Sequence, residues 1–382
     1  MLKTAYRKSV LSHNGNSVRR LTNSYVKVNL DFSSNDYLGL SHHPEVIEAG
    51  SKAALMYGAG ATGSRLLSGN YAGLAKLESE IARCKKTEAA LIFNSGFQCN
   101  MSVLSSLLNQ KHIHADPIVF FDRYNHASLY QAIFFSGAKL VRYRHNDIEH
   151  LKMLMSSYQD DVRPKMIVTE SVFGMDGDIA PIHQILDLCR VHGALLYLDE
   201  AHATGIMGAQ GYGLSSELDF SDVTTVVMGT FSKALGVCGA YIAAEKSIID
   251  YLINFCPGFI YSTALSPFTV GAAYAGWRLL PSFKEKRHSL QVNSNYLRDQ
   301  LKALGFQVGN SSTNIIPIIL GDDALTKRVH KNLLKHNIQV SCVLPPTVPV
   351  GTSRLRIALN VNHTKKDIDE FIEVLSCIHI QK

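Results

Sequence analysis

Short apolar runs alternate with amphipathic segments along the chain from about residue 87. Each run is brief and apolar throughout, as in strands that are covered on both faces. The segments between them include residues 182–192, where Ile182, Ile185, Leu186 and Cys189 recur at helical spacing. This rhythm predicts an α/β fold with a mostly parallel sheet and helices on both of its faces. The predicted strands occupy residues 89–93, 118–121, 139–143, 166–169, 194–198, 224–228 and 239–243.

The pattern changes after a long helical stretch at residues 270–304. Strand-like runs then alternate with two helical patterns, which predicts a small α+β domain. The runs are 315–320, 339–343 and 354–359, and the helical patterns are 325–336 and 366–378. We therefore expect an N-terminal segment, 1–45, that packs on the small domain, then a large domain, 46–280, and the small C-terminal domain, 281–382.

Composition excludes several classes of protein. Hydrophobic residues make up 46% and charged residues 18% of the 382, as in a globular chain and not a disordered one. The net charge of +6 comes from scattered basic residues, so no nucleic-acid surface is predicted. No window approaches the ~20 apolar residues that span a bilayer, and residues 1–17 hold no signal-peptide core. The seven cysteines form no Cys-x-x-Cys pair. We expect a cytoplasmic protein without metal, membrane or nucleic-acid partners.

Lys233 is the most informative residue in the chain. It lies in residues 229–236 (GTFSKALG), directly after an apolar run rich in β-branched residues. A lysine at the end of a buried strand can form a Schiff base with an aldehyde cofactor, above all when its pKa is lowered. Another apolar run ends in Asp199 and is followed by His202. An aspartate that pairs with a pyridinium nitrogen and a lysine are the minimal protein contribution to pyridoxal phosphate chemistry.

Polar residues follow several of the predicted strands. Open α/β folds bind ligands at the carboxyl edge of the sheet, so these side chains should converge there. Residues 94–97 combine a strand end, small residues and a helix start, which suits an anion, although a plain strand-to-helix turn has the same pattern. Arg354 and Arg356 point to one face of their strand, and we expect one to bind a carboxylate and the other to be a surface charge. The polar residues at strand ends are His126, Glu170, Asp199, His202, Thr230 and Lys233.

Two further motifs suggest other functions, but their context is wrong. Residues 58–63 match a dinucleotide-binding fingerprint, yet a helical pattern precedes them where a strand is required. Residues 199–202 match a helicase box, yet the chain contains no Gly-Lys dipeptide for a phosphate loop. Neither nucleotide binding nor helicase activity is therefore predicted.

These motifs together resemble the α-oxoamine synthases, a family of pyridoxal phosphate enzymes of fold type I, over nearly the whole chain. The resemblance implies a seven-stranded sheet in the large domain, a homodimer with shared active sites, and amino-acid and acyl thioester substrates. It is carried by residues 34–39, 60–65, 122–129, 169–178, 198–205, 230–233, 261–263 and 345–356.

The resemblance also implies a role for each matching residue. Lys233 would carry the cofactor and then move the α-proton of the substrate, and Asp199 would keep the pyridine nitrogen protonated. His126 would stack on the ring, His202 would hydrogen-bond its oxygen, and Glu170 would tune the site from behind. The implied phosphate contacts are Gly96, Phe97 and Thr230, with Ser262 and Thr263 from the partner subunit. The implied substrate contacts are Asn35, His126, Thr347 and Arg356, of which Arg356 takes the amino-acid carboxylate.

Within the family, residues 32–41 and 345–349 are most similar to the biotin-pathway members, which condense L-alanine with a pimeloyl thioester of coenzyme A or acyl carrier protein. Gly174, a cofactor-contact position, stands where the family commonly has Ser, Leu74 where it has His, and Leu344 where these members have Arg. Arg7 is the candidate for an N-terminal substrate arginine. The alternative is a synthase that uses glycine, serine or another acyl thioester, such as an aminoketone signal synthase. A non-catalytic scaffold subunit is a remote alternative.

Overall fold

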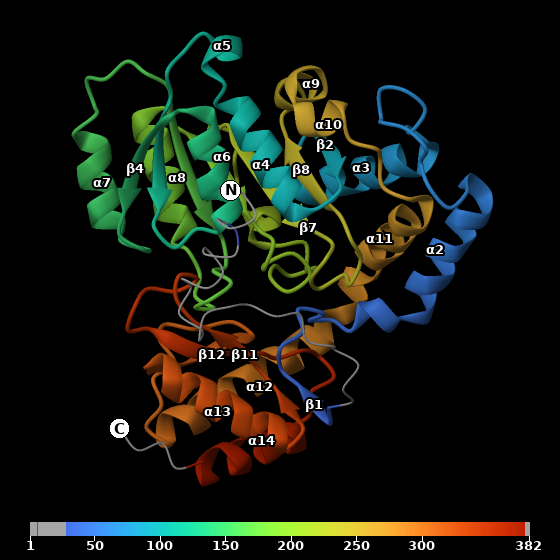
Figure 1. The fold of residues 1–382 in the computed structure, drawn as a ribbon. Helices are drawn as coiled ribbons and strands as arrows, with labels where there is room; N and C mark the ends of the chain where they lie inside the picture. The colour runs from blue at the N-terminus through green and yellow to red at the C-terminus, as the bar shows by residue number, and fades with distance from the viewer. Residues whose placement is uncertain (1–5, 7–27, 379–382) are drawn as a thin grey trace.

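The protein is described by a computed structural model, which places residue 6 and residues 28–378. A large body holds a seven-stranded sheet, and a smaller body below it holds a three-stranded sheet with its own helices (Figure 1). The α/β fold with a mostly parallel sheet, predicted from the hydrophobic pattern, is confirmed. Within the described residues, no helix is both long and apolar enough to cross a membrane.

The large sheet has the strand order β2-β8-β7-β6-β5-β3-β4. All neighbours are parallel except β8, which runs antiparallel to both β2 and β7. Four adjacent parallel strands, β7, β6, β5 and β3, therefore end at the same edge. The strands are β2 (Ala89–Phe93), β3 (Ile118–Asp122), β4 (Lys139–Tyr143), β5 (Lys165–Glu170), β6 (Leu195–Asp199), β7 (Thr225–Thr230) and β8 (Ala240–Ala244).

Helices cover both faces of this sheet, which is why its strands are apolar throughout. In β3, Val119 and Phe121 pack with α4 and α6, whereas Ile118 and Phe120 pack with α7 and α8 on the opposite face. A third apolar cluster joins the β2–β8 edge to α3 and α11. The helices are α2 (Pro44–Tyr57), α3 (Ala72–Lys85), α4 (Gly96–Leu107), α5 (Gln110–Ile113), α6 (Ala127–Ser136), α7 (Ile148–Ser156), α8 (Ile182–His192), α9 (Lys246–Phe255), α10 (Pro257–Ile260) and α11 (Pro267–Leu279), with 3-10 turns η1 (Leu40–His42), η2 (Leu214–Glu217) and η3 (Leu280–Phe283).

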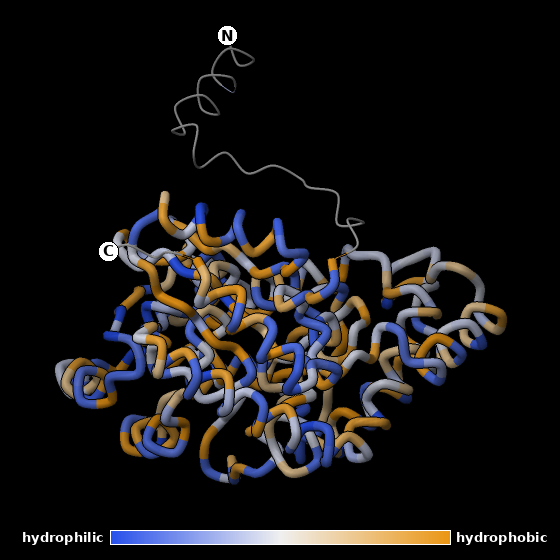
Figure 2. The backbone as a smooth tube through the Cα atoms, turned by 90° about the horizontal axis from the view of Figure 1, so that it is seen from below, coloured by the Kyte–Doolittle hydropathy of each residue, from blue (hydrophilic) through white to orange (hydrophobic). Residues whose placement is uncertain are grey.

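The smaller body is built on an antiparallel sheet of order β11-β12-β9. Its apolar core lies between this sheet and the helices α12, α13 and α14. These helices bury one side, for example Val329 and Leu333 of α13 and Phe371 and Leu375 of α14. Figure 2 shows the corresponding alternation of hydrophobic and hydrophilic residues along the backbone. The elements are α12 (Lys284–Ala303), β9 (Ile315–Gly321), α13 (Asp323–Lys335), β10 (Ile338–Gln339), β11 (Ser341–Val343), β12 (Ser353–Ala358) and α14 (Lys365–Cys377).

The first described segment of the chain joins this smaller body. Strand β1 (Leu30–Asp31) pairs in parallel with β10, and Phe32 is buried against Phe371 of α14. The chain then turns toward β12, and this brings Asn35 and Tyr37 to Arg356. The N-terminal segment thus carries polar side chains to the boundary between the two bodies.

Candidate active site

The polar strand ends of the large sheet lie along one edge, opposite β12 of the smaller body. Glu170 ends β5, Asp199 ends β6 and Thr230 ends β7, and these three strands are neighbours. His126 follows the end of β3 as the N-cap of α6. The topology brings together the residues that the sequence analysis assigned to a single edge.

Asp199 is held in place by a buried polar network. Asn100 of α4 donates hydrogen bonds to Asp199 Oδ2, at 2.8 Å, and to Ser128 Oγ, at 3.0 Å. Tyr197 donates to Asn100 Oδ1, and the backbone N–H of Ala201 donates to Asp199 Oδ1, both at 2.8 Å. These bonds fix the carboxylate in one orientation. Sequence reasoning missed Asn100, whose only signal was a polar residue on the buried side of a helix.

His126 and Glu170 form a second pair at this edge. The backbone N–H of His126 donates to Glu170 Oε1 at 2.6 Å, and His126 Nδ1 lies 2.8 Å from Ser128 Oγ. Burial, followed by the charge of Asp199, raises the pKa of Glu170 well above its usual value. Burial also lowers the pKa of His126. The lowered pKa favours the neutral form of the His126 imidazole. The Phe97 ring meets this imidazole edge-on, with centroids 6.4 Å apart.

Lys233 lies in the loop that follows β7. Burial lowers the pKa of its amine to about 8, against the opposing charges of Asp199 and Glu170. No ion pair or hydrogen bond to another described residue engages this amine. Gly236 closes the loop with a left-handed φ of 65°, and a Cβ there would come within 2.4 Å of the Ser41 backbone nitrogen. Glycine is thus required where the lysine loop meets the N-terminal segment.

Tyr37 links His202 to Arg356 across the two bodies. Its hydroxyl lies 2.8 Å from His202 Nδ1 and 3.2 Å from Arg356 Nη2, and it donates to Asn35 Oδ1 at 3.1 Å. The direction of the bond between Tyr37 and His202 Nδ1 depends on the tautomer of the imidazole. Burial lowers the pKa of His202 well below its usual value, so the ring is neutral. Tyr37 was not assigned a role from the sequence.

Arg356 and Arg354 both contact residues 171–180, the loop after β5. Arg356 donates from Nε to the carbonyl of Gly174 at 2.5 Å, and Arg354 pairs with Asp176 at 2.6 Å. The expectation that one arginine would be a surface charge is wrong, because both are buried. A Cβ on Gly174 would lie 2.2 Å from His202 Nε2. The missing side chain at 174 is therefore what allows His202 to approach this loop.

Gly96 and Thr230 form a small cradle at the start of α4. A Cβ on Gly96 would be 3.2 Å from Met228 Cε and 3.7 Å from Thr230 Oγ1. The first N–H groups of a helix lack partners within it, and at this helix Ser95 caps the N–H of Gln98. The N–H groups of Gly96 and Phe97 are thus available to an anion. The residues fit a phosphate group that enters beside Thr230.

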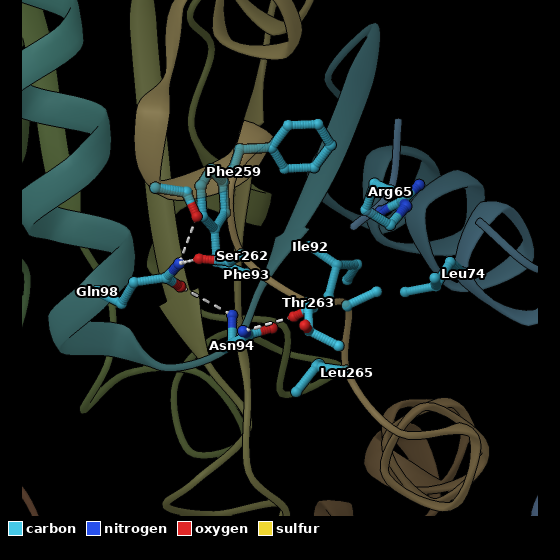
Figure 3. A pocket seen from close by; sticks show the side chains of 12 residues that line it. Arg65, Leu74, Ile92, Phe93, Asn94, Gln98, Phe259, Ser262, Thr263 and Leu265 are labelled. Carbon is cyan, nitrogen blue, oxygen red and sulfur yellow. Dashed lines mark hydrogen bonds between the residues drawn. The ribbon is translucent and has the colours of Figure 1, made fainter. Parts of the chain in front are cut away.

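Ser262 and Thr263 lie beside Asn94 and Gln98, the residues that flank the start of α4, in the same chain (Figure 3). Gln98 donates to Ser262 Oγ at 3.0 Å, and Asn94 donates to the Thr263 carbonyl at 2.8 Å. Leu74 is buried in the lining of the same small pocket. The expected reach of Ser262 and Thr263 into a partner's site stays a prediction.

The remaining described residues that the sequence assigned to the substrate lie away from the strand ends of the large sheet. Thr347 is exposed in the loop between β11 and β12, and Leu344 is partly buried at the start of that loop. Arg7 falls outside the described residues. In the part of the chain that the structure describes, no cluster of His, Cys, Asp or Glu could hold a metal ion.

Comparisons with known proteins cover nearly the whole chain. The family "Aminotransferase class I and II" matches residues 27–375. A protein of Paramagnetospirillum magneticum named "Putative 8-amino-7-oxononanoate synthase" is 46% identical over 346 residues, 91% of this chain and 87% of that protein. A variant of serine palmitoyltransferase from S. paucimobilis with a bound PLP-myriocin aldimine has a TM-score of 0.87 at 28% identity, over 98% of this chain and 96% of that one. The 8-amino-7-oxononanoate synthase of Francisella tularensis has a TM-score of 0.77 at 29% identity, over 91% and 96%.

Proposed function

The chain belongs to the class I and II aminotransferase family as a pyridoxal-phosphate-dependent, α-oxoamine-synthase-like enzyme, and from this premise we propose that it makes 8-amino-7-oxononanoate for biotin synthesis. The reaction would condense L-alanine with a pimeloyl thioester and release carbon dioxide and the free thiol. The observation that carries the proposal is the position of the Lys233 amine. Its pKa is lowered, it lies at the same sheet edge as Asp199, and Arg356 lies across the boundary between the two bodies.

The residues present fit the cofactor. The N–H groups of Gly96 and Phe97, with Thr230, would hold its phosphate. Asp199, fixed by Asn100, would pair with the pyridine nitrogen, while neutral His126 would lie against the ring face. When bound, the cofactor supplies an electron-accepting ring that stabilises negative charge at the α-carbon of the amino acid.

The chain's own groups then position the substrate and move its proton. Arg356 would grip the amino-acid carboxylate with its guanidinium, supported by Asn35. The Lys233 amine, neutral in a large fraction of molecules near pH 8, would take the α-proton and return it to the product. His202 Nε2, on a neutral ring whose Nδ1 bonds Tyr37, would share a hydrogen bond with the ring oxygen or the substrate.

We also propose a homodimer whose subunits share active sites, with Ser262 and Thr263 contributing to the partner's phosphate contacts. Support comes from the position of both residues beside Asn94 and Gln98, next to the start of α4. A dimer that joins two such regions would bring these hydroxyls near a second phosphate cradle.

A second candidate function is condensation of another amino acid with another acyl thioester. Leu344 favours it, because an apolar side chain before residues 345–349 offers no charge to a terminal carboxylate such as that of a pimeloyl chain. The high TM-score with serine palmitoyltransferase is consistent with the same alternative. The relative named "Putative 8-amino-7-oxononanoate synthase", at 46% identity, favours the first candidate. A non-catalytic scaffold is disfavoured, because Lys233, Asp199 and His126 are all present.

A thiol-release assay distinguishes these candidates. L-Alanine, glycine and L-serine are each combined with pimeloyl, heptanoyl and palmitoyl thioesters, on coenzyme A and on acyl carrier protein. Heptanoyl is the matched control, because it has the length of pimeloyl without the terminal carboxylate. The proposal expects the highest kcat/KM for L-alanine with the pimeloyl thioester and no turnover by Lys233→Ala. Equal rates with heptanoyl, or a preference for glycine or serine, would refute it.

A further inference from the structure

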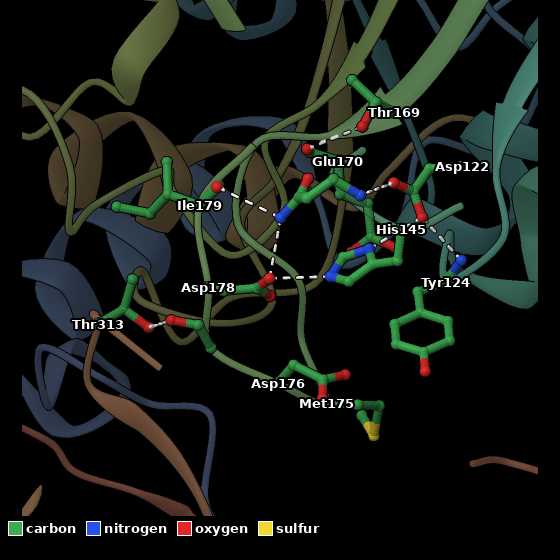
Figure 4. A network of polar contacts seen from close by, with 12 residues as sticks. Asp122, Tyr124, His145, Thr169, Glu170, Met175, Asp176, Asp178, Ile179 and Thr313 are labelled. Carbon is green, nitrogen blue, oxygen red and sulfur yellow. Dashed lines mark hydrogen bonds and ion pairs between the residues drawn. The ribbon is translucent and has the colours of Figure 1, made fainter. Parts of the chain in front are cut away.

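His145 forms a largely buried bridge between two carboxylates outside the cofactor site (Figure 4). Its Nδ1 lies 2.9 Å from Asp122 Oδ1, at the end of β3, and its Nε2 lies 2.8 Å from Asp178 Oδ2, in the loop 171–180. A neutral imidazole can donate from one nitrogen only, so two carboxylate contacts require the protonated ring. Tyr124 stacks on one face of the ring with centroids 4.4 Å apart, and Phe173 meets it edge-on.

The bridge holds its charges largely away from water. The side chains of Asp122 and Asp178 are almost fully buried, and Asp178 Oδ1 has no hydrogen-bond partner. Asn146 adds a bond from its backbone N–H to Asp122 and another from its amide to Asp178. Removing one member of a buried ionic cluster leaves an uncompensated charge, which is strongly destabilising locally. The geometry of the loop 171–180 therefore depends on the cation between the two aspartates.

The same loop connects to the smaller body at three points. The Gly174 carbonyl accepts from Arg356, and Asp176 pairs with Arg354. The Gly177 carbonyl accepts from the hydroxyl and backbone N–H of Thr313, before β9. Asp122, the other carboxylate of the bridge, contacts the large body. It accepts a hydrogen bond from the backbone N–H of Tyr124, in the turn that leads to His126. One imidazolium thus stabilises both the loop that holds Arg356 and the turn that presents His126.

We propose that His145 is a positioning residue: its bridge between Asp122 and Asp178 fixes the loop 171–180 so that Gly174 holds Arg356 in the orientation that binds the amino-acid carboxylate. The proposal rests on the proposed function, in which Arg356 takes that carboxylate. His145 itself touches no substrate. Its loss should weaken the amino-acid site and leave the acyl thioester site unchanged.

The test compares the cofactor-bound wild type with His145→Gln, Asp178→Asn and the double variant. His183→Gln is the control, because His183 is an exposed histidine on α8. We expect His145→Gln to raise the KM for the amino acid at least about tenfold, the order expected when a hydrogen bond to a charged group is misplaced. The KM for the thioester should stay the same. Hydrogen exchange of the peptide 171–180 should accelerate, and the double variant, which removes an unpaired buried charge, should lie closer to wild type than His145→Gln alone.

Two results would overturn the proposal: unchanged exchange of the peptide 171–180 in His145→Gln, or faster exchange with an unchanged amino-acid KM. Equal increases in both KM values would also count against it, because a general structural defect does that. The amino acid used is whichever of alanine, glycine or serine the wild type prefers, so a failure of the alanine assignment leaves this test intact. A wild type that accepts none of them refutes the proposed function, and the exchange measurement then decides on the bridge.

Discussion

The reactivity of Lys233 follows from its surroundings. Burial disfavours the charged amine, and the nearby carboxylates Asp199 and Glu170 offset this only partly, so the pKa falls to about 8. We expect acetic anhydride to acetylate Lys233 in the cofactor-free protein at a rate that rises with a midpoint near pH 8, followed by peptide mass spectrometry. Lys52, which is exposed on α2, serves as the internal comparison. An identical pH dependence for the two lysines would contradict a lowered pKa at Lys233.

The role of a single residue was predictable from the sequence where the neighbouring residues alone show that it lies at the end of a strand. Asp199 directly follows an apolar run, and Lys233 lies in the short segment after another. Tyr37 and Asn100 were not assigned, because their roles depend on distant partners. Tyr37 meets His202 across 165 positions, and Asn100 meets Asp199 across 99. No local pattern distinguishes a tyrosine or asparagine that will find such a partner from one that will not.

At the scale of elements, apolar runs gave the strands of the large sheet within one or two residues, because strands covered on both faces contain little else. The run 339–343 was predicted as one strand and is two. Strand β10 pairs with β1, and β11 pairs with β12 in a different sheet. The stretch 270–304 was predicted as one helical region, but Pro281 lacks a backbone donor, and the 3-10 turn η3 separates α11 from α12 there. An apolar pattern indicates burial and does not identify the pairing partner.

The link between α3 and the loop after β6 is a buried ion pair with a predictable energetic cost. Lys85 of α3 contacts Glu200 with both side chains fully buried, and the Ser215 backbone N–H donates to the same carboxylate at 2.9 Å. Lys85→Met should lower the free energy of unfolding by about 3–5 kcal/mol, because it leaves the Glu200 charge unpaired. Urea unfolding measures this loss.

The matched double variant distinguishes charge from packing. Adding Glu200→Gln to Lys85→Met removes the unpaired charge and keeps an acceptor for Ser215, so we expect it to recover part of the lost stability. Lys52→Met, which disrupts the exposed pair with Glu48, should leave the urea midpoint nearly unchanged. If the double variant were less stable than Lys85→Met, the loss would come from packing around the methionine and not from the charge of Glu200.

At the scale of the whole molecule, polar contacts join the large and small bodies around the loop 171–180. The sequence allowed a prediction that an arginine on the 354–359 run binds a carboxylate, but not that both arginines reach this loop. Arg354 and Arg356 have the same alternation pattern as surface residues, and their burial exists only because Asp176 and the Gly174 carbonyl lie opposite. The division of the chain at residues 45 and 280 stays a prediction.

The stability of the whole fold should depend on pH through His145. Burial lowers the pKa of this imidazole, but the bonds and charges of Asp122 and Asp178 outweigh that effect and raise it to about 9. A folded pKa above the unfolded value of about 6.5 contributes stability that is complete below about pH 6.5 and is lost as the pH rises through 9. Lys233 titrates with the opposite sign near pH 8, so the wild-type curve alone does not isolate His145. The difference in urea midpoint between wild type and His145→Gln isolates the contribution of His145, because Lys233 is present in both proteins.

We expect this difference in urea midpoint to be largest at pH 6 and to shrink toward pH 10. A difference that stays constant over that range would mean that neutral His145 stabilises the fold equally well, and that the bridge is not ionic.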